Sequence, residues 1–94
     1  MIIGACTITL HLHGVYSLKE KRSIIKSLQA RLRNEFNVSV AEVDAQDAHG
    51  RAVLGVACVS SSADYARGQL DAILRWIERE RPDVPVIDHV IELL

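Results

Sequence analysis

Residues 17–36, SLKEKRSIIKSLQARLRNEF, decide the fold because they predict one long amphipathic helix with a marked start. Ser17, followed three residues later by Glu20, is a capping box, which supplies hydrogen-bond partners for backbone N–H groups at a helix start. Apolar side chains recur at helical spacing along the stretch and predict the face that packs against a sheet. These side chains are Leu18, Ile25, Leu28, Leu32 and Phe36.

The same helix carries most of the positive charge of the chain. Residues 18–36 have a net charge of +4, the remainder of the chain has −5, and the whole chain has −1. At 100° per residue, four of the cations fall within about 60° of one another and form a row about 21 Å long. We call this row the basic stripe; it consists of Lys19, Arg22, Lys26 and Arg33, with Lys21 and Arg31 at its edges.

A row of cations on a helix can contact nucleic-acid phosphates, because each pairing releases condensed counterions. The alternative is a solvated helix face whose long side chains cover apolar surface with their stems. If the row binds nucleic acid, six residues are predicted to make the contacts: Lys19, Lys21, Arg22, Lys26, Arg31 and Arg33.

Outward from this helix, the hydrophobic periodicity predicts four strands and a second helix. The strands are expected at residues 2–12, 38–45, 51–60 and 86–94, and the second helix at about residues 63–80, with Ser61 and Asp64 as its capping pattern. The order strand, helix, strand, strand, helix, strand is the split βαβ plan of an α+β, ferredoxin-like sandwich. Right-handed crossovers then place both helices on one face of a four-stranded antiparallel sheet of order 4-1-3-2. The length fits a single domain, residues 1–94.

The other face of that sheet is expected to be open to water or to a partner. Residues 51–60, RAVLGVACVS, nevertheless read as a strand that needs cover on both faces, or nearly so. A second hypothesis is therefore a homo-oligomer that pairs through the open sheet face or an edge strand and binds a small ligand at the seam. The residues expected on that face are Thr7, Thr9, Val53 or Leu54, and Val86 or Ile87.

The expected central strands contain no aromatic residue, and aromatics make up only 4% of the chain. Base stacking on the sheet, as in the RNA-recognition motif, is thereby excluded. Any bound RNA would be held through its backbone charge and shape. On the second helix, Tyr65 and Trp76 lie on a flank of the apolar stripe; Trp76 is expected to fill the groove between the helices, and the alternative is that it anchors a partner.

Composition points to the cytoplasm and to a protein that is not embedded in a membrane. No apolar run is long enough to span a bilayer, and no secretory leader pattern precedes the first strand. Cys6 and Cys58 are isolated cysteines within hydrophobic strands, which favours reduced, buried thiols, although a redox pair would be feasible if their strands were neighbours. No cofactor motif is present, and we predict no cofactor.

Three small clusters are weaker candidates for chemistry. His11 and His13 share a strand face and could chelate a metal if Asp88 and Glu92 joined them. We favour the interpretation that they are polar residues on the open face of the sheet, and we predict no metal site. His49 with Asp44 or Asp47 could form a general base. We favour the interpretation that these residues stabilise a turn, in which Gly50 can take a positive φ.

The third cluster is the loop at residues 13–17, where Gly14 and Ser17 precede a helix start and could bind an anion. This strand and helix order is similar to that of acylphosphatases, which hold phosphate in such a loop. Their loop supplies an arginine where this one has Ser17, so a small acylphosphatase-like hydrolase is the least favoured hypothesis. We predict no catalytic residues.

Three segments carry a resemblance to a known family: SLKEKR (17–22), FNVSVAEVD (36–44) and QDAHGRA (46–52). They resemble the YlxP-like family, small bacterial proteins classed as a domain of unknown function. The resemblance implies a cytosolic bacterial protein with a ferredoxin-like fold, and it supplies no catalytic residues. Genes of that family often lie beside those for translation initiation factor two and ribosome-binding factor A. The leading hypothesis is thus a non-catalytic factor that contacts ribosomal RNA or the ribosome through its basic first helix.

Overall fold

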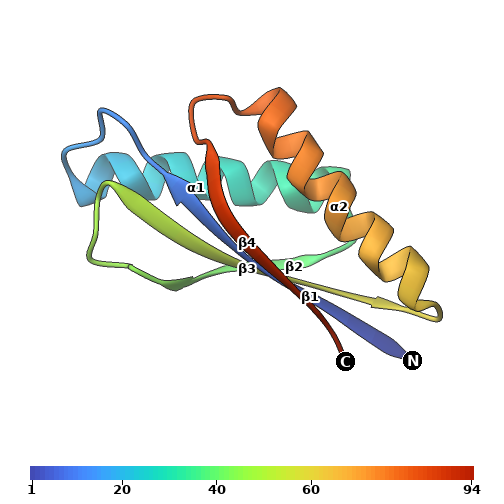
Figure 1. Cartoon of the computed structure of the whole chain (residues 1–94). Helices are drawn as coiled ribbons and strands as arrows, with labels where there is room; N and C mark the ends of the chain where they lie inside the picture. Colours follow the sequence, from blue (N-terminus) through green and yellow to red (C-terminus); the bar gives the residue numbers. More distant parts are fainter.

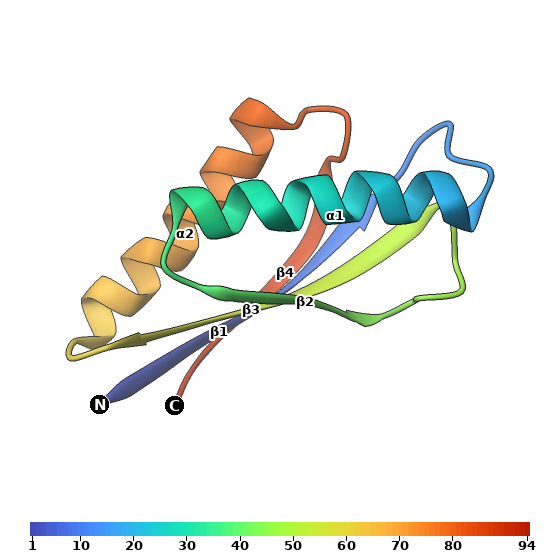
Figure 2. The ribbon, with the colours of Figure 1, turned by 180° about the vertical axis from the view of Figure 1, so that it is seen from behind.

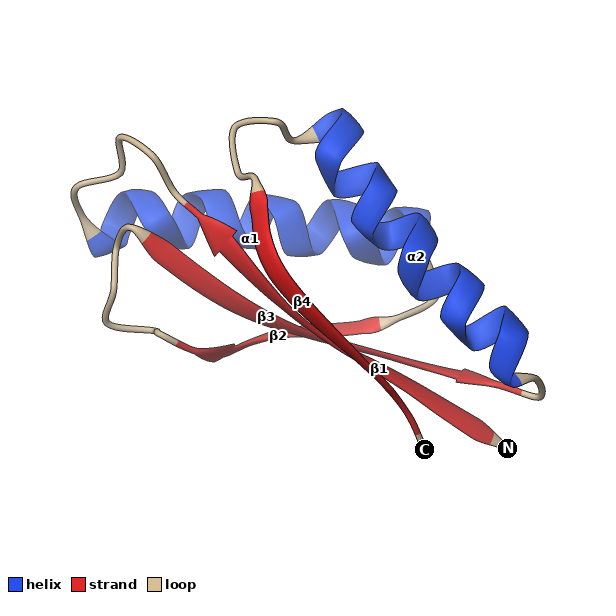
Figure 3. Cartoon of the chain, in the orientation of Figure 1, coloured by secondary structure: helices blue, strands red, loops and turns tan.

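Six elements follow one another in the predicted order. The computed structural model describes residues 1–94, with β1 (Ile2–His11), α1 (Leu18–Glu35), β2 (Ser39–Asp44), β3 (Arg51–Ser60), α2 (Ala63–Glu80) and β4 (Val86–Leu93). The four strands are antiparallel and lie side by side in the order β2-β3-β1-β4 (Figure 3). This is the predicted 4-1-3-2 order, so the α+β, ferredoxin-like sandwich is confirmed.

Both helices cover the same face of the sheet, and the opposite face has no layer above it (Figure 1). The chain termini lie next to each other, because the backbone N–H of Ile3 donates to Leu94 and that of Leu94 donates back, at 2.9 and 2.8 Å. Neither helix has the length and apolar character needed to cross a bilayer.

Each helix starts at a serine cap. The Ser17 hydroxyl accepts a hydrogen bond from the Glu20 N–H at 3.1 Å, as predicted. At α2 the prediction was one residue early, because the cap is Ser62, which accepts from the Tyr65 N–H at 3.4 Å, and not Ser61. A serine hydroxyl reaches only the N–H two or three residues ahead, so the helix start fixes which serine can act as the cap.

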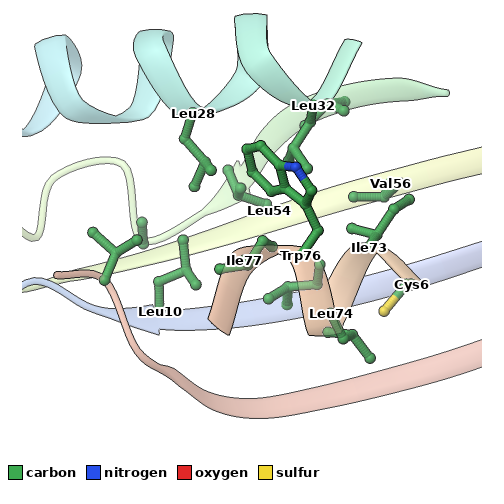
Figure 4. Packing of buried hydrophobic residues seen from close by; sticks show 14 of the residues in the cluster. Cys6, Leu10, Leu28, Leu32, Leu54, Val56, Ile73, Leu74, Trp76 and Ile77 are labelled. Carbon is green, nitrogen blue, oxygen red and sulfur yellow. The ribbon is translucent and has the colours of Figure 1, made fainter. Parts of the chain in front are cut away.

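The core lies between the sheet and the two helices. Alternate β1 side chains point into it, and the apolar face of α2 covers them. Trp76 is 4% exposed and fills the groove between the helices, where its ring meets Phe36 edge to face at a centroid distance of 6.3 Å. Figure 4 shows its indole between Leu32 of α1 and the strands. The groove-filling role predicted for Trp76 is confirmed.

The bare face of the sheet is defined by the strand registers. Thr7 and Thr9 of β1 lie on it, beside Val53 of β3, whereas Leu54 is fully buried on the helix side. On β4, Val86 packs against the core, and Ile87 lies at a bulge and is exposed. The expectation that β3 has cover on both faces, or nearly so, is met in part, because on the open side Val53 is 9% exposed whereas Val59 is 67% exposed.

Both cysteines are free thiols buried on the helix side of adjacent strands. Cys6 is paired in register with Val56, and Cys58 with Gly4, so the two are offset by two positions along neighbouring strands. Burial, together with the charge of Asp71, raises the pKa of the Cys6 thiol to about 11. A buried thiol with so high a pKa is a core residue, because the thiolate is the nucleophile.

We therefore predict that neither thiol of the native protein reacts with a chromogenic disulfide reagent at pH 8 within minutes. Both should react at once in guanidinium chloride, because unfolding exposes both thiols and restores the ordinary pKa of the Cys6 thiol. The measurement is reagent release with and without denaturant. A rapid native phase would contradict the burial of these thiols.

Candidate nucleic-acid interface

Three members of the basic stripe lie on the exposed side of α1 and are unpaired. Lys19, Arg22 and Lys26 are exposed and make neither an ion pair nor a side-chain hydrogen bond. The neighbouring exposed positions are small or neutral: Ser23, Ser27, Ala30 and Asn34. The exposed carboxylate of Glu20 borders this side next to Ser27, so a flat polyanionic surface would approach most favourably over Lys19, Arg22 and Lys26.

The other two arginines of α1 face in different directions and are engaged. Arg33 Nη2 donates to the Val40 carbonyl oxygen of β2 at 2.9 Å. The Arg31 guanidinium lies on the opposite flank of α1, over the Trp76 ring, with its Cζ 4.8 Å from the ring centroid. The basic stripe therefore runs along the side of α1 that faces the edge strand β2, away from α2, as Figure 2 shows for α1 and β2.

Lys21 is placed differently from the prediction. It is 1% exposed, so it cannot contact a phosphate outside the protein, and the structure removes it from the predicted nucleic-acid-binding set. Its Nζ donates to the carbonyl oxygens of Ala45 and Ala48, both at 2.6 Å, and lies 2.8 Å from Glu42 Oε2. The ammonium therefore donates two hydrogen bonds and forms an ion pair with Glu42, whose buried Oε2 accepts no hydrogen bond.

A sequence signal for this burial was present. At 100° per residue, Lys21 falls between Leu28 and Leu32, at the centre of the apolar stripe of α1. A lysine in the middle of an apolar stripe indicates a buried cation with a specific partner. Its carbonyl partners lie 24 and 27 residues further along the chain, so no local pattern could identify them.

The β2–β3 loop is held in an unusual conformation beside Lys21. Ala45 has φ 58°, in the left-handed region, whereas the sequence suggested that Gly50 would take a positive φ. The Asp44 carboxylate accepts a hydrogen bond from the Ala45 N–H at 2.7 Å, and His49 Nδ1 lies 2.9 Å from the Val15 carbonyl oxygen. The Asp–His cluster thus serves the turn, in line with the preferred reading of these residues.

The remaining candidate residues lie apart from this interface. The exposed His11 and His13 rings are 6.0 Å apart, and no group of three or more metal-ligating side chains forms around them. Gly14 is exposed with φ 76°, and the Ser17 hydroxyl is used as the helix cap. Anion binding by Gly14 and Ser17 stays a prediction.

The buried ammonium predicts a large cost for removing it. Lys21→Met should lower the free energy of unfolding by about 3 kcal/mol, because it leaves a mostly buried carboxylate and two carbonyls without their donor. Chemical denaturation measures this. The matched control is Lys19→Met, an exposed lysine one half-turn away, which should change stability by less than about 0.5 kcal/mol. Equal effects of the two substitutions would contradict the role assigned to Lys21.

The strained loop residue predicts a stabilising substitution. Ala45→Gly should raise the free energy of unfolding by about 0.5–1 kcal/mol, since glycine adopts positive φ without the Cβ clash. Ala48→Gly, in the same loop but at ordinary φ, should lower it by a similar amount. Thermal and chemical denaturation of both variants tests the pair, and a destabilised Ala45→Gly variant would refute the strain argument.

Comparison with known proteins identifies the relatives of this chain. Residues 3–91 match the family model described as "Protein of unknown function (DUF503)". The chain is also 36% identical over 77 residues to the "Uncharacterized protein YlxP" of Bacillus subtilis (strain 168), an alignment that covers 82% of this chain and 84% of that protein. The three segments that suggested the resemblance meet around the Lys21 ammonium. The chain therefore belongs to the DUF503 family, which includes the YlxP-like proteins.

Proposed function

We propose that this protein is a non-catalytic factor that binds structured RNA, in the context of the ribosome, through the exposed face of α1. The observation that supports this proposal is the group of three exposed and unpaired cations, Lys19, Arg22 and Lys26, on one face of one helix. They occupy about 10 Å along the helix at 1.5 Å rise per residue.

The other cations of α1 have partners within the chain, which makes the three unpaired ones distinctive. Lys21 is buried, Arg31 lies over an indole, and Arg33 covers a backbone carbonyl of the edge strand. Outside residues 18–36 the chain carries a net charge of −5. A polyanion is therefore attracted to this face and repelled by much of the remaining surface, which would fix the orientation of the complex.

The expected mode of binding is to the phosphate backbone. The two largely exposed aromatics, Tyr16 and Tyr65, lie near helix starts and not on the sheet, so the sheet offers no base-stacking platform. Contacts from lysine and arginine to phosphates position a protein on its target without reading sequence. We expect folded RNA segments, recognised by shape, to be the targets.

The test is co-sedimentation with purified ribosomal subunits at low and moderate salt, with binding to a folded RNA fragment measured in parallel. The variant replaces Lys19, Arg22 and Lys26 with Gln. We expect at least a tenfold loss of affinity and a flatter salt dependence, with the slope of log K against log salt reduced by about 2, since each lost phosphate contact removes about 0.7–0.9.

The matched control replaces three exposed arginines of α2 with Gln, namely Arg67, Arg75 and Arg79. It changes the net charge by the same amount, so it separates the position of the charge from its total. Binding should persist in the control. No binding of the wild type at low salt, or equal loss in both triple variants, would refute a specific role for the α1 face.

A further inference from the structure

We infer that the open face of the sheet binds a second copy of this chain, in a face-to-face dimer whose two-fold axis runs along the strands between β1 and β3. The inference is independent of the RNA proposal. It starts from β3, whose sequence is apolar on both faces although its open side is only partly covered in the single chain, with Val53 buried and Val59 exposed. Val43, Val59 and Val90 are all more than half exposed on the open side.

This face also contains a hollow. It has a volume of about 520 Å³, and small residues of three strands line it, among them Ala5, Ala41, Gly55 and Ala57. Val43 forms one wall, because a Cβ placed on Gly55 would lie only 2.8 Å from its Cγ1. The hollow is thus apolar and bounded by a branched side chain, as expected for a surface that receives an apolar side chain.

The registers place a matching projection in the same cross-strand row. Ala41 pairs with Gly55, Gly55 with Thr7, and Thr7 with Val90, so the row runs from the hollow at β2 to an exposed valine at β4. A two-fold axis that runs along the strands, between β3 and β1, places this row of one copy over the same row of the other copy in the opposite order. Val90 of each copy then faces Ala41 of the other, and the valine enters the partner's hollow.

The hollow selects this axis over one that runs across the strands, because only the axis along the strands places Val90 over the partner's Ala41. Acidic residues of the open face lie on both edge strands, Asp88 and Glu92 on β4 and Asp44 on β2, where Asp44 pairs with Val53. With the axis along the strands, Asp44 of one copy lies opposite Asp88 of the other at each margin of the interface. With the axis across them, β4 would stack on β4 and bring Asp88 and Glu92 together, so charge does not distinguish the two arrangements.

The sheet edges are poor alternatives for self-association. Strand β2 has only six residues and a register shift. Its Val40 carbonyl already accepts a hydrogen bond from the Arg33 side chain. Strand β4 carries Asp88, His89 and Glu92, and charged side chains protect an edge from pairing. The open face is the apolar surface that remains, and its use would leave both copies of the α1 face exposed on the outside.

The size of the face predicts a weak dimer. At about 3.3 Å along and 4.8 Å across per residue, the four strands cover roughly 500 Å², so a pair buries roughly 1,000 Å². That area lies at the lower limit for a specific interface, so we expect a dissociation constant in the micromolar range.

Sedimentation equilibrium of the full chain from about 1 to about 500 micromolar tests the inference, because an interface of this size becomes populated within that range. The wild type should approach twice the chain mass. Ala41→Glu and Val90→Lys should each remain monomeric across the range, since each buries a charge against apolar surface. The control Ala63→Glu, at an exposed position at the start of α2, should dimerise like the wild type.

Combining Ala41→Glu and Val90→Lys in one chain tests the row itself. The new carboxylate at position 41 of one copy would face the new ammonium at position 90 of the other, so the double variant should recover at least tenfold in association over either single variant. Circular dichroism establishes that each variant is folded. A wild type that stays monomeric, a folded Ala41→Glu variant that still dimerises, or a folded double variant that recovers nothing would each overturn the inference.

Discussion

The arrangement of the fold depends on one buried ammonium. Lys21 lies in the first turns of α1 at 1% exposure, and its three contacts, with Ala45, Ala48 and Glu42, join α1 to β2 and to the loop that follows β2. A buried charge of this kind is tolerated only when it is paired and hydrogen-bonded, so the ion pair and the two hydrogen bonds fix the helix and the loop together. It also sets the rotation of α1 about its axis, because a turn of one residue step would carry Lys21 out of reach of all three acceptors.

The cations of α1 fall into two groups with different roles, those with a partner in the chain and those without. Lys21 points into the fold and forms an ion pair there, whereas Arg31 and Arg33 are exposed but engaged at its surface, over an indole and on an edge carbonyl. Lys19, Arg22 and Lys26 point away from it and remain unpaired. The distinction matters for function, because only unpaired cations can exchange solvent counterions for phosphates.

The sequence was sufficient for the elements and their order, because those depend on local periodicity and capping. Ser17 and the alternation along β1 are examples, and both are found where they were predicted. It was insufficient where a residue's role depends on distant backbone. Lys21 was grouped with the surface cations because its acceptors, more than 20 residues away, could not be identified locally, and Ala45, whose carbonyl accepts from that lysine, has a positive φ that no local pattern indicated. The same limit applied to β3, whose two apolar faces could be read from the sequence, whereas the number of layers that cover them could not.

The two faces of the sandwich have opposite physical properties, and this constrains how they can be used together. The helix face carries unpaired cations over a fully packed core, and the open face carries valines and a hollow, with acids at both margins. A polyanion is attracted to the first and gains little at the second, whereas a copy of the chain can cover the second without blocking the first. Pairing through the open face would place two α1 faces on opposite sides of one particle. Two such faces cannot both lie flat on one compact phosphate surface, so each copy would contact a separate RNA segment, and any gain from bivalency would depend on the distance between those segments.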